Sequence, residues 1–476
     1  MQNDTIFEYL ASHREAMLSD LATLVAIPSV RGDGEEGMPF GREVDAALRA
    51  AEALFAREGF ATERDPLGRY ALVHFGEGER EIALLAHLDV VPAGEGWTLT
   101  APFVPRLVDG CLVGRGAHDN KGGVVASLYL LMALRDLGLA PACRVTVFLG
   151  AAEETGMEDA HAFAERTPLP DVALVPDNDP PLSIGEKGRV TAWLVSPAEL
   201  STVREITGGT AYNVVLDTAT ARLLYSEALL AELSAAVAER EDMTLIAAPD
   251  AGELTLTCRG IAAHASHPVG SRNAAAELCA LLASCSTLSF DERGVLAAAA
   301  LFTKDPYGGT LGIAGEDGPF GRRTAVCGMV RTQASRLFLS EDIRFGVPFS
   351  TLSDDLFEGV DGEDYELCLT SCDEPFDHGD GDPLAARLMD AFRRLTGDTA
   401  ATPYRSGGGT YARCLPRAYS CGLLYRETGD ASPLALPAGH GDPHTPDEYV
   451  SGEELVRGTR ILAEYLLTAA AYLANE

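Results

Sequence analysis

The chain has 476 residues, of which 46% are hydrophobic and 23% are charged, and its formal net charge is -34. These proportions are typical of a soluble globular protein, and the length suggests roughly two to three domains. A surface this acidic repels phosphate backbones and anionic lipid, so we expect neither nucleic acid nor a membrane as a partner. The first residues lack the pattern of a signal peptide, no apolar run is long enough to span a membrane, and the ten cysteines are scattered. We therefore predict a cytoplasmic protein with reduced thiols.

Helix and strand patterns alternate along the first part of the chain. Apolar residues recur at helical spacing over residues 6–24, and Ile27-Pro28 ends this predicted helix. Apolar runs predict strands at residues 81–85, 144–149 and 172–175, with a helix at 121–137 after the first of them. Such alternation predicts a mostly parallel sheet with helices on its faces. Ligands of these sheets bind beyond the carboxyl ends of the strands.

The pattern changes after about residue 188. Residues 253–259 and 365–369 alternate between apolar and polar side chains, as half-buried antiparallel strands do, and residues 218–240 and 274–284 are predicted helices. We therefore predict an inserted α+β domain over residues 189–386 and a second domain formed by residues 1–188 and 387–476. A capping box of Ser451 and Glu454 is predicted to begin the last helix.

Residues that commonly bind metals follow the predicted strands, and one more lies far downstream. Each has an ordinary explanation by itself, such as a helix cap, a turn residue or a solvated surface pair. Together they provide two imidazoles and several carboxylates, which is the ligand set of a two-metal hydrolytic site with one glutamate left as a base. Zn2+ favours these ligands, and Mn2+ or Co2+ can substitute. The candidates are His87, Asp89, Asp119, Glu153, Glu154, Asp177 and His444.

Several segments resemble the di-zinc peptidase family that contains aminoacylase, acetylornithine deacetylase, succinyl-diaminopimelate desuccinylase and the PepV-type dipeptidases. The segments are AHLDVVPAGEGW, DGCLVGRGAHDNKGG, PDNDPPLSIGEKG and GGGTYAR. The resemblance covers nearly the whole chain and is strongest to the PepV-type dipeptidases. It implies an α/β, zinc-peptidase-type catalytic domain with a mostly parallel central sheet, together with a large inserted α+β lid domain.

The resemblance also implies a role for each candidate ligand. Asp119 would bridge two metal ions, His87 and Asp177 would complete one site, and Glu154 and His444 would complete the other. Glu153 would be the general base, and Asp89 would orient His87. The family pattern further implies a cis peptide bond after Asp119. Asn120 stands where many relatives have a second aspartate, which removes one charge beside the metals.

The predicted insert carries further matches to the family. CRGIAAHASHP implies that His264 donates a hydrogen bond to the developing oxyanion, and GGTAYNVVLD places Asn213 near the substrate. EDIRFGVP implies that Arg344 holds a substrate carboxylate, although Asp342 and Phe345 replace the Asn and Tyr of the family. Gly408 and Gly409 would shape the substrate pocket. Without the resemblance, His264 would be an ordinary histidine at a strand end, and the glycines would form a flexible loop.

These features together predict a metal-dependent dipeptidase. Such an enzyme would hydrolyse the peptide bond of short peptides with free termini through a metal-bridging hydroxide. The alternative is a deacylase or desuccinylase of N-acyl amino acids that uses the same two metal ions. Because the insert is long, the resemblance implies a monomer whose lid and catalytic domains close around the substrate.

Overall fold

The computed structural model of this chain describes residues 2–361, 365–426, 432–437 and 439–476. These residues divide into two compact units. Unit 1 comprises Met1–Gly185, His378–Tyr404 and Thr410–Glu476, and unit 2 comprises Glu186–Asp377 and Arg405–Gly409. The predicted α/β class with an α+β insert is confirmed. None of the helices within the described ranges is long and apolar enough to cross a membrane.

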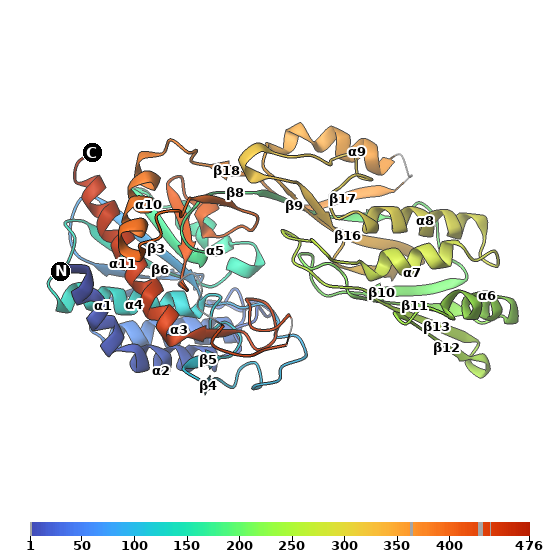
Figure 1. Cartoon of the computed structure of the whole chain (residues 1–476), viewed down its shortest axis with the longest axis horizontal. Helices are drawn as coiled ribbons and strands as arrows, with labels where there is room; N and C mark the ends of the chain where they lie inside the picture. Colours follow the sequence, from blue (N-terminus) through green and yellow to red (C-terminus); the bar gives the residue numbers. More distant parts are fainter. Residues whose placement is uncertain (1, 362–364, 427–431, 438) are drawn as a thin grey trace. The chain divides into compact units, whose positions relative to one another are not determined.

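Unit 1 is built on a sheet whose central strands are parallel (Figure 1). The strand order is β1-β2-β6-β3-β7-β20-β8, and the parallel strands are β6, β3, β7 and β20. The strands are β1 (Thr62–Arg64), β2 (Ala71–Phe75), β3 (Glu81–His87), β6 (Arg144–Gly150), β7 (Val172–Asn178), β8 (Ser183–Glu186) and β20 (Ala418–Gly422). A small second sheet joins β4 (Arg106–Val108), β5 (Cys111–Val113) and β21 (Tyr449–Ser451). The predicted strands are therefore confirmed, each with a longer carboxyl end.

The helices of unit 1 include the one predicted after Asp119. They are α1 (Gln2–Ser12), α2 (Arg14–Val25), α3 (Arg42–Arg57), α4 (Lys121–Asp136), α5 (Glu158–Ala164), α10 (Pro383–Thr396) and α11 (Gly452–Leu473), with short 3-10 helices η1 (Glu153–Thr155) and η5 (Tyr411–Cys414). The single helix predicted over residues 6–24 is instead two helices, α1 and α2, which meet at His13. The short strands β18 (Phe376–Asp377) and β19 (Tyr404–Ser406) lie where the chain passes between the units.

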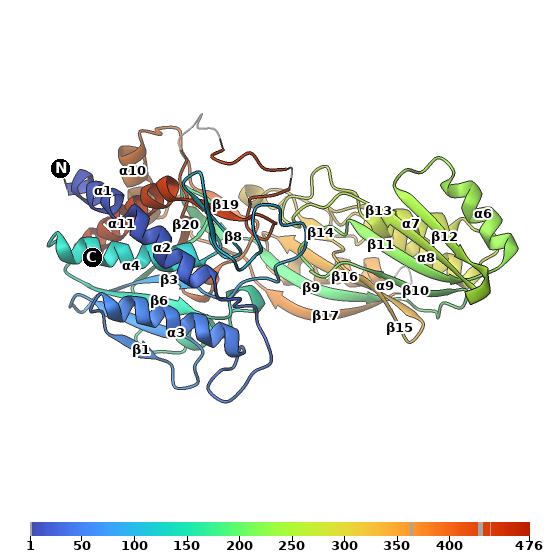
Figure 2. The same cartoon turned by 90° about the horizontal axis from the view of Figure 1, so that it is seen from below.

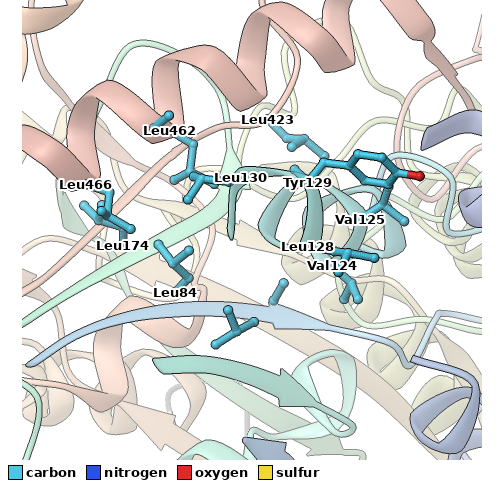
Figure 3. Close-up of a cluster of buried hydrophobic side chains, with 14 of the residues drawn as sticks. Leu84, Val124, Val125, Leu128, Tyr129, Leu130, Leu174, Leu423, Leu462 and Leu466 are labelled. Atoms are coloured by element: carbon cyan, nitrogen blue, oxygen red, sulfur yellow. The ribbon is translucent and has the colours of Figure 1, made fainter. Parts of the chain in front are cut away.

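Alternate residues of the central strands face two different layers. Leu84 of β3 and Leu174 of β7 point toward α4 and α11, where they meet Leu130, Leu462 and other apolar side chains (Figure 3). Phe148 of β6 points to the opposite layer and packs against Phe163 of α5, with ring centroids 4.9 Å apart. Since a fully buried leucine contributes about 1.5–3 kcal/mol, this double packing holds the central strands firmly in place.

Unit 2 is an antiparallel sheet with helices packed against it (Figure 2). The strand order is β12-β13-β11-β10-β15-β16-β9-β17, and β14 pairs with β16. The strands are β9 (Gly188–Val195), β10 (Val203–Gly208), β11 (Thr218–Leu224), β12 (Met243–Ala248), β13 (Glu253–Arg259), β14 (Thr324–Val326), β15 (Val330–Gln333), β16 (Arg336–Phe345) and β17 (Glu366–Asp373). The helices are α6 (Glu227–Val237), α7 (Ala274–Ala283), α8 (Phe290–Lys304) and α9 (Ser353–Asp361), with short 3-10 helices η2 (Pro249–Ala251), η3 (Gly318–Phe320) and η4 (Phe349–Thr351).

Two local predictions were wrong. The helix predicted over residues 218–240 begins only at α6, because Ala219, Ala221 and Leu223 are buried at every second position and form strand β11. The predicted capping box is also absent. Ser451 is the residue before α11, but its side chain makes no capping hydrogen bond, and the carboxylate of Glu454 pairs with Arg426 instead.

Candidate functional site

The sheet of unit 1 brings most of the predicted ligands to one edge. His87 is the last residue of β3, and the strands on either side of it are β6 and β7. Glu153 and Glu154 follow β6, and Asp177 lies near the end of β7. Because these three strands are adjacent and parallel, their carboxyl ends meet. Asp119 comes from the turn between β5 and α4.

The carboxylate of Asp119 lies between two imidazoles. Its Oδ1 is 3.0 Å from Nε2 of His87, and its Oδ2 is 3.0 Å from Nε2 of His444. His87 Nε2 is also 3.5 Å from Oδ2 of Asp177, and His444 Nε2 is 3.0 Å from Oε1 of Glu154. The residues thus form two groups of three that share Asp119.

The electrostatics of this cluster are those of closely packed opposite charges. Burial by itself would lower the pKa of His87, but the carboxylates of Asp177 and Asp119 outweigh it and raise that pKa well above its usual value. Burial raises the pKa of Glu153 well above its usual value, and Asp177 and Glu154 add to the effect. Among the carboxyl groups of the cluster, Glu153 is the one whose pKa is raised well above its usual value, whereas the pKa of Asp119 is lowered.

The donor atoms fit two divalent cations. Ligand atoms about 2.0 Å from a tetrahedral zinc ion lie about 3.3 Å from one another. The separations between the imidazole nitrogens and the carboxylate oxygens are 3.0–3.5 Å, and the ligand atoms of each group lie within 4.8 Å of one another. The cluster also has an excess of carboxylates over imidazoles, and bound cations would balance that negative charge.

Asp89 contacts both His87 and the backbone of the glutamate pair. Nδ1 of His87 lies 2.9 Å from the backbone oxygen of Asp89 and 3.4 Å from its carboxylate. The two carboxylate oxygens accept the backbone N–H groups of Glu153 and Glu154, each at 3.1 Å. Asp89 therefore fixes the backbone of the glutamate pair as well as the imidazole.

The structure gives a reason for an asparagine at position 120 in place of an aspartate. Its amide nitrogen donates to the backbone oxygen of Pro176 at 2.7 Å, one residue before Asp177, and an ionised aspartate could not make this bond. The side chain thus ties the turn at Asp119 to the end of β7. The Asp119–Asn120 peptide bond is cis, as the family resemblance implied.

Two supporting residues near the glutamate pair escaped the sequence analysis. Asp159 of α5 is fully buried, and its Oδ2 accepts the N–H groups of Ala151 (2.6 Å) and Ala152 (3.0 Å) and the hydroxyl of Tyr411 (2.5 Å). Burial raises the pKa of Asp159 to about 6. A glycine at position 150 is the trace that this arrangement leaves in the sequence, because a Cβ there would collide with the Tyr411 hydroxyl. Asp159 and Asp89 together accept the backbone N–H groups of four consecutive residues, 151–154, which include the glutamate pair.

Glu448 was also missed, because an acid beside His444 in GDPHTPDEY has the pattern of a surface loop. Its side chain is fully buried. Oε1 accepts the N–H groups of His118 (3.0 Å) and Asp119 (3.1 Å), and Oε2 accepts Nη1 of Arg115 (2.6 Å). Glu448 therefore connects the segment that carries His444 to the segment that carries Asp119.

Unit 2 brings together its own predicted residues. The N–H of Ala265 donates to the backbone oxygen of Asn213 at 2.8 Å, so the segments of Asn213 and His264 run side by side. Gly407 lies against Ser266, since a Cβ at Gly407 would come 2.8 Å from Cβ of Ser266. The glycines at 408 and 409 follow directly.

Arg344 is held by groups of its own unit. Its Nε and Nη2 donate to the carboxylate of Asp342 at 2.5 and 3.1 Å, and its Nη1 donates to the backbone oxygen of Gly407 at 2.9 Å. Asp342 also accepts from Nε of Arg189 at 3.0 Å. A guanidinium has five N–H groups, so Nη1 and Nη2 of Arg344 each retain one that these bonds do not use. The Asp342 carboxylate balances part of the charge of this guanidinium.

Comparisons with known sequences agree with this geometry. The family model of peptidase family M20/M25/M40 matches residues 83–468. The chain is 29% identical over 469 residues to the Bacillus subtilis (strain 168) protein named "Putative dipeptidase YtjP", covering 96% of this chain and 98% of that protein. It is 27% identical over 475 residues to a Staphylococcus aureus (strain bovine RF122 / ET3-1) protein that also has "Putative dipeptidase" in its name, covering 96% of this chain and 97% of that one.

Solved structures share the fold. Human carnosine dipeptidase 1 superposes with a TM-score of 0.60 at 16% identity, covering 98% of this chain and 100% of that chain. The Saccharomyces cerevisiae dipeptidase Dug1p superposes with a TM-score of 0.59 at 14% identity, covering 99% of each chain. At these identities the similarity is one of fold.

Proposed function

The chain belongs to peptidase family M20/M25/M40, and from this premise we propose that it is a metal-dependent dipeptidase. The observation that carries the proposal is the position of Asp119, whose two carboxylate oxygens each lie 3.0 Å from a different imidazole. A carboxylate shared in this way suits a bridging ligand. Relatives that cover nearly the whole chain and have dipeptidase names support the choice of substrate.

We propose one ligand role for each member of the cluster. Asp119 would be shared by the two ions, His87 and Asp177 would hold one, and Glu154 and His444 would hold the other. The ions are proposed to be two Zn2+, with Mn2+ or Co2+ as substitutes. When bound, they polarise the scissile carbonyl and make water acidic enough to attack at neutral pH.

The chain's own residues would move the proton and bind the substrate. Glu153 takes a proton from the attacking water on its carboxylate and delivers it to the leaving amine nitrogen. Its raised pKa suits a group that must hold this proton between the two transfers. Asp89 keeps the backbone of the glutamate pair and His87 in place. His264 donates to the oxyanion that develops on the carbonyl.

The remaining residues of unit 2 would recognise the ends of the peptide. Asn213 offers a polar side chain on the segment beside His264, and Gly408 and Gly409 offer backbone groups. Arg344 would bind the substrate carboxylate through the N–H groups of Nη1 and Nη2 that do not donate to Asp342 or Gly407. Because Asp342 shares this guanidinium, we expect only a moderate loss of affinity when the substrate carboxylate is amidated.

We also propose the roles of the two domains, the oligomeric state and the cellular compartment. Residues 1–188 and 387–476 would form the catalytic domain, and residues 189–386 the lid. The insert of about 200 residues has the size of a full domain and favours a monomer. The ten cysteines, none of which forms a disulfide, favour the cytoplasm.

A metal analysis combined with a substrate panel tests the proposal. The protein is stripped with a chelator, reloaded with Zn2+, Mn2+ or Co2+, and assayed on free dipeptides, amidated dipeptides and N-acetyl or N-succinyl amino acids. We expect two ions per chain and turnover of free dipeptides only in the reloaded protein. Preferential turnover of the N-acyl amino acids would instead establish a deacylase.

A further inference from the structure

Three polar groups of unit 2 form a hydrogen-bonded series beside the proposed oxyanion donor. Nδ1 of His264 lies 2.6 Å from Oγ of Ser266, and that oxygen lies 3.0 Å from Nδ1 of His267. The backbone N–H of Ser266 also donates to Nδ1 of His264, at 3.2 Å. The series lies on a loop that packs against Gly407 and pairs with the Asn213 segment.

The backbone N–H determines the direction of every bond in the series. A backbone N–H can only donate, so Nδ1 of His264 must accept, and the neutral ring carries its proton on Nε2. The Ser266 hydroxyl then has to donate to the same Nδ1, because two lone pairs 2.6 Å apart would repel each other. The oxygen of Ser266 is left to accept, so His267 carries a proton on its Nδ1.

This order matters for the proposed role of His264. An oxyanion is stabilised by an N–H donor, whereas the other tautomer would offer the lone pair of Nε2 in the same place. The ring is exposed, so burial does little to select its tautomer or its orientation. The two bonds from Ser266 to Nδ1 restrain both the tautomer and the orientation of the ring.

We propose that Ser266 and His267 are positioning residues that hold His264 as the Nε2–H tautomer with its ring oriented for substrate. This inference rests on the proposed function, because it assumes that His264 contacts the reacting carbonyl. Ser266 acts directly on the ring of His264. His267 acts through Ser266, because its Nδ1–H directs the serine hydroxyl toward His264.

The tautomers can be observed without any activity measurement. The full chain is labelled with 15N-histidine, and the ring protons are located by long-range 1H–15N correlation spectra, with His264→Gln and His267→Gln variants to assign the signals. We expect the proton on Nε2 of His264 and on Nδ1 of His267. Because imidazole in water favours the Nε2–H form, His267 is the more discriminating signal. A proton on Nδ1 of His264, or a neutral His267 that lacks one there, would overturn the proposed order.

Substitutions of Ser266 test whether the order matters for catalysis. Ser266→Ala removes the hydroxyl but keeps the backbone donor, so His267 should return to the Nε2–H form while His264 keeps its proton. We expect kcat to fall about fivefold, the equivalent of about one hydrogen bond, with KM unchanged. Ser266→Thr retains the hydroxyl and should restore kcat.

Ser271→Ala is the matched control. Ser271 lies on the same loop, and its hydroxyl donates to the backbone oxygen of Pro268 at 2.6 Å, so its loss should change neither tautomers nor kcat. An unchanged kcat in Ser266→Ala would refute the positioning role even if the spectra show the expected tautomers. An unchanged kcat in His264→Ala, which has no side-chain donor, would instead refute the oxyanion role of the proposed function, and the spectra would still report separately on the hydrogen-bond order.

Discussion

Replacing Glu448 by glutamine should weaken metal binding without removing any ligand. The buried carboxylate accepts the N–H groups of His118 and Asp119 on one oxygen and Nη1 of Arg115 on the other. Glutamine can keep an acceptor for the two amides, but its NH2 group then faces the guanidinium. The turn that directs Asp119 between the two imidazoles loses its fixed position relative to the segment of His444.

The structure sets the expected magnitudes. The side chains of Arg115 and Glu448 are 2% and 0% exposed, and removing one partner of a buried ion pair costs about 3–5 kcal/mol. Groups that orient metal ligands typically contribute about 10- to 100-fold to metal affinity. Glu448→Gln should therefore lower both the free energy of unfolding and the affinity for Zn2+. Arg115→Met in the same chain should recover part of the stability but not the affinity.

Competition titration of the metal-free protein with a zinc chelator measures the affinity, and urea denaturation measures the stability. Glu454→Gln is the matched control, because Glu454 is also buried and pairs with Arg426 at 2.5 Å in the first turn of α11. It should lose stability and keep its zinc affinity. The reasoning is refuted if Glu448→Gln binds zinc as tightly as this control.

Three further substitutions test the base and two buried acids. Glu153→Gln should lower kcat by about 10²- to 10⁴-fold and leave the metal content unchanged, which steady-state assays and metal analysis would check; wild-type turnover would exclude the role of base. Glu341 of β16 is buried with neither oxygen hydrogen-bonded among the described residues, and burial raises its pKa well above the usual value. The wild type should therefore lose stability relative to Glu341→Met as the pH rises above the ordinary glutamate pKa of 4.5, because the unfolded chain then releases a proton that the folded chain keeps. Urea denaturation of chains that keep Trp193 as the only tryptophan measures this, and an equal pH dependence of the two proteins would contradict it. Asp159, with a pKa raised to about 6, is charged in the unfolded chain but largely uncharged in the fold at pH 5. The wild type should lose about 2 kcal/mol of stability relative to Asp159→Asn as the pH rises from 4 to 6. Urea denaturation of chains that keep Trp97 as the only tryptophan measures this, and a constant difference between the two proteins would refute the assignment.

The local sequence pattern was enough to predict the elements that carry the site. The strands β3, β6 and β7 and the helix α4 have uniform apolar stretches ended by polar or small residues, and all four were confirmed. Where the local signals conflicted, the prediction failed. Residues 218–224 contain helix-forming alanine and leucine, but their burial against β10 and β13 makes them a strand.

The sequence by itself determined the family, the sheet edge and the types of candidate ligand, because strand patterns and the residues that follow them are local properties. Only the tertiary structure showed which acids are buried supports and which are candidate ligands. Glu448 and Asp119 are 329 positions apart, and Tyr411 and Asp159 are 252 apart. Nothing in a local pattern distinguishes such an acid from a solvated one, because burial and hydrogen-bond partners are set by segments that meet only in the folded chain. The same holds for Arg344, whose partial engagement by Asp342 and Gly407 depends on a strand and a returning segment that lie 63 residues apart.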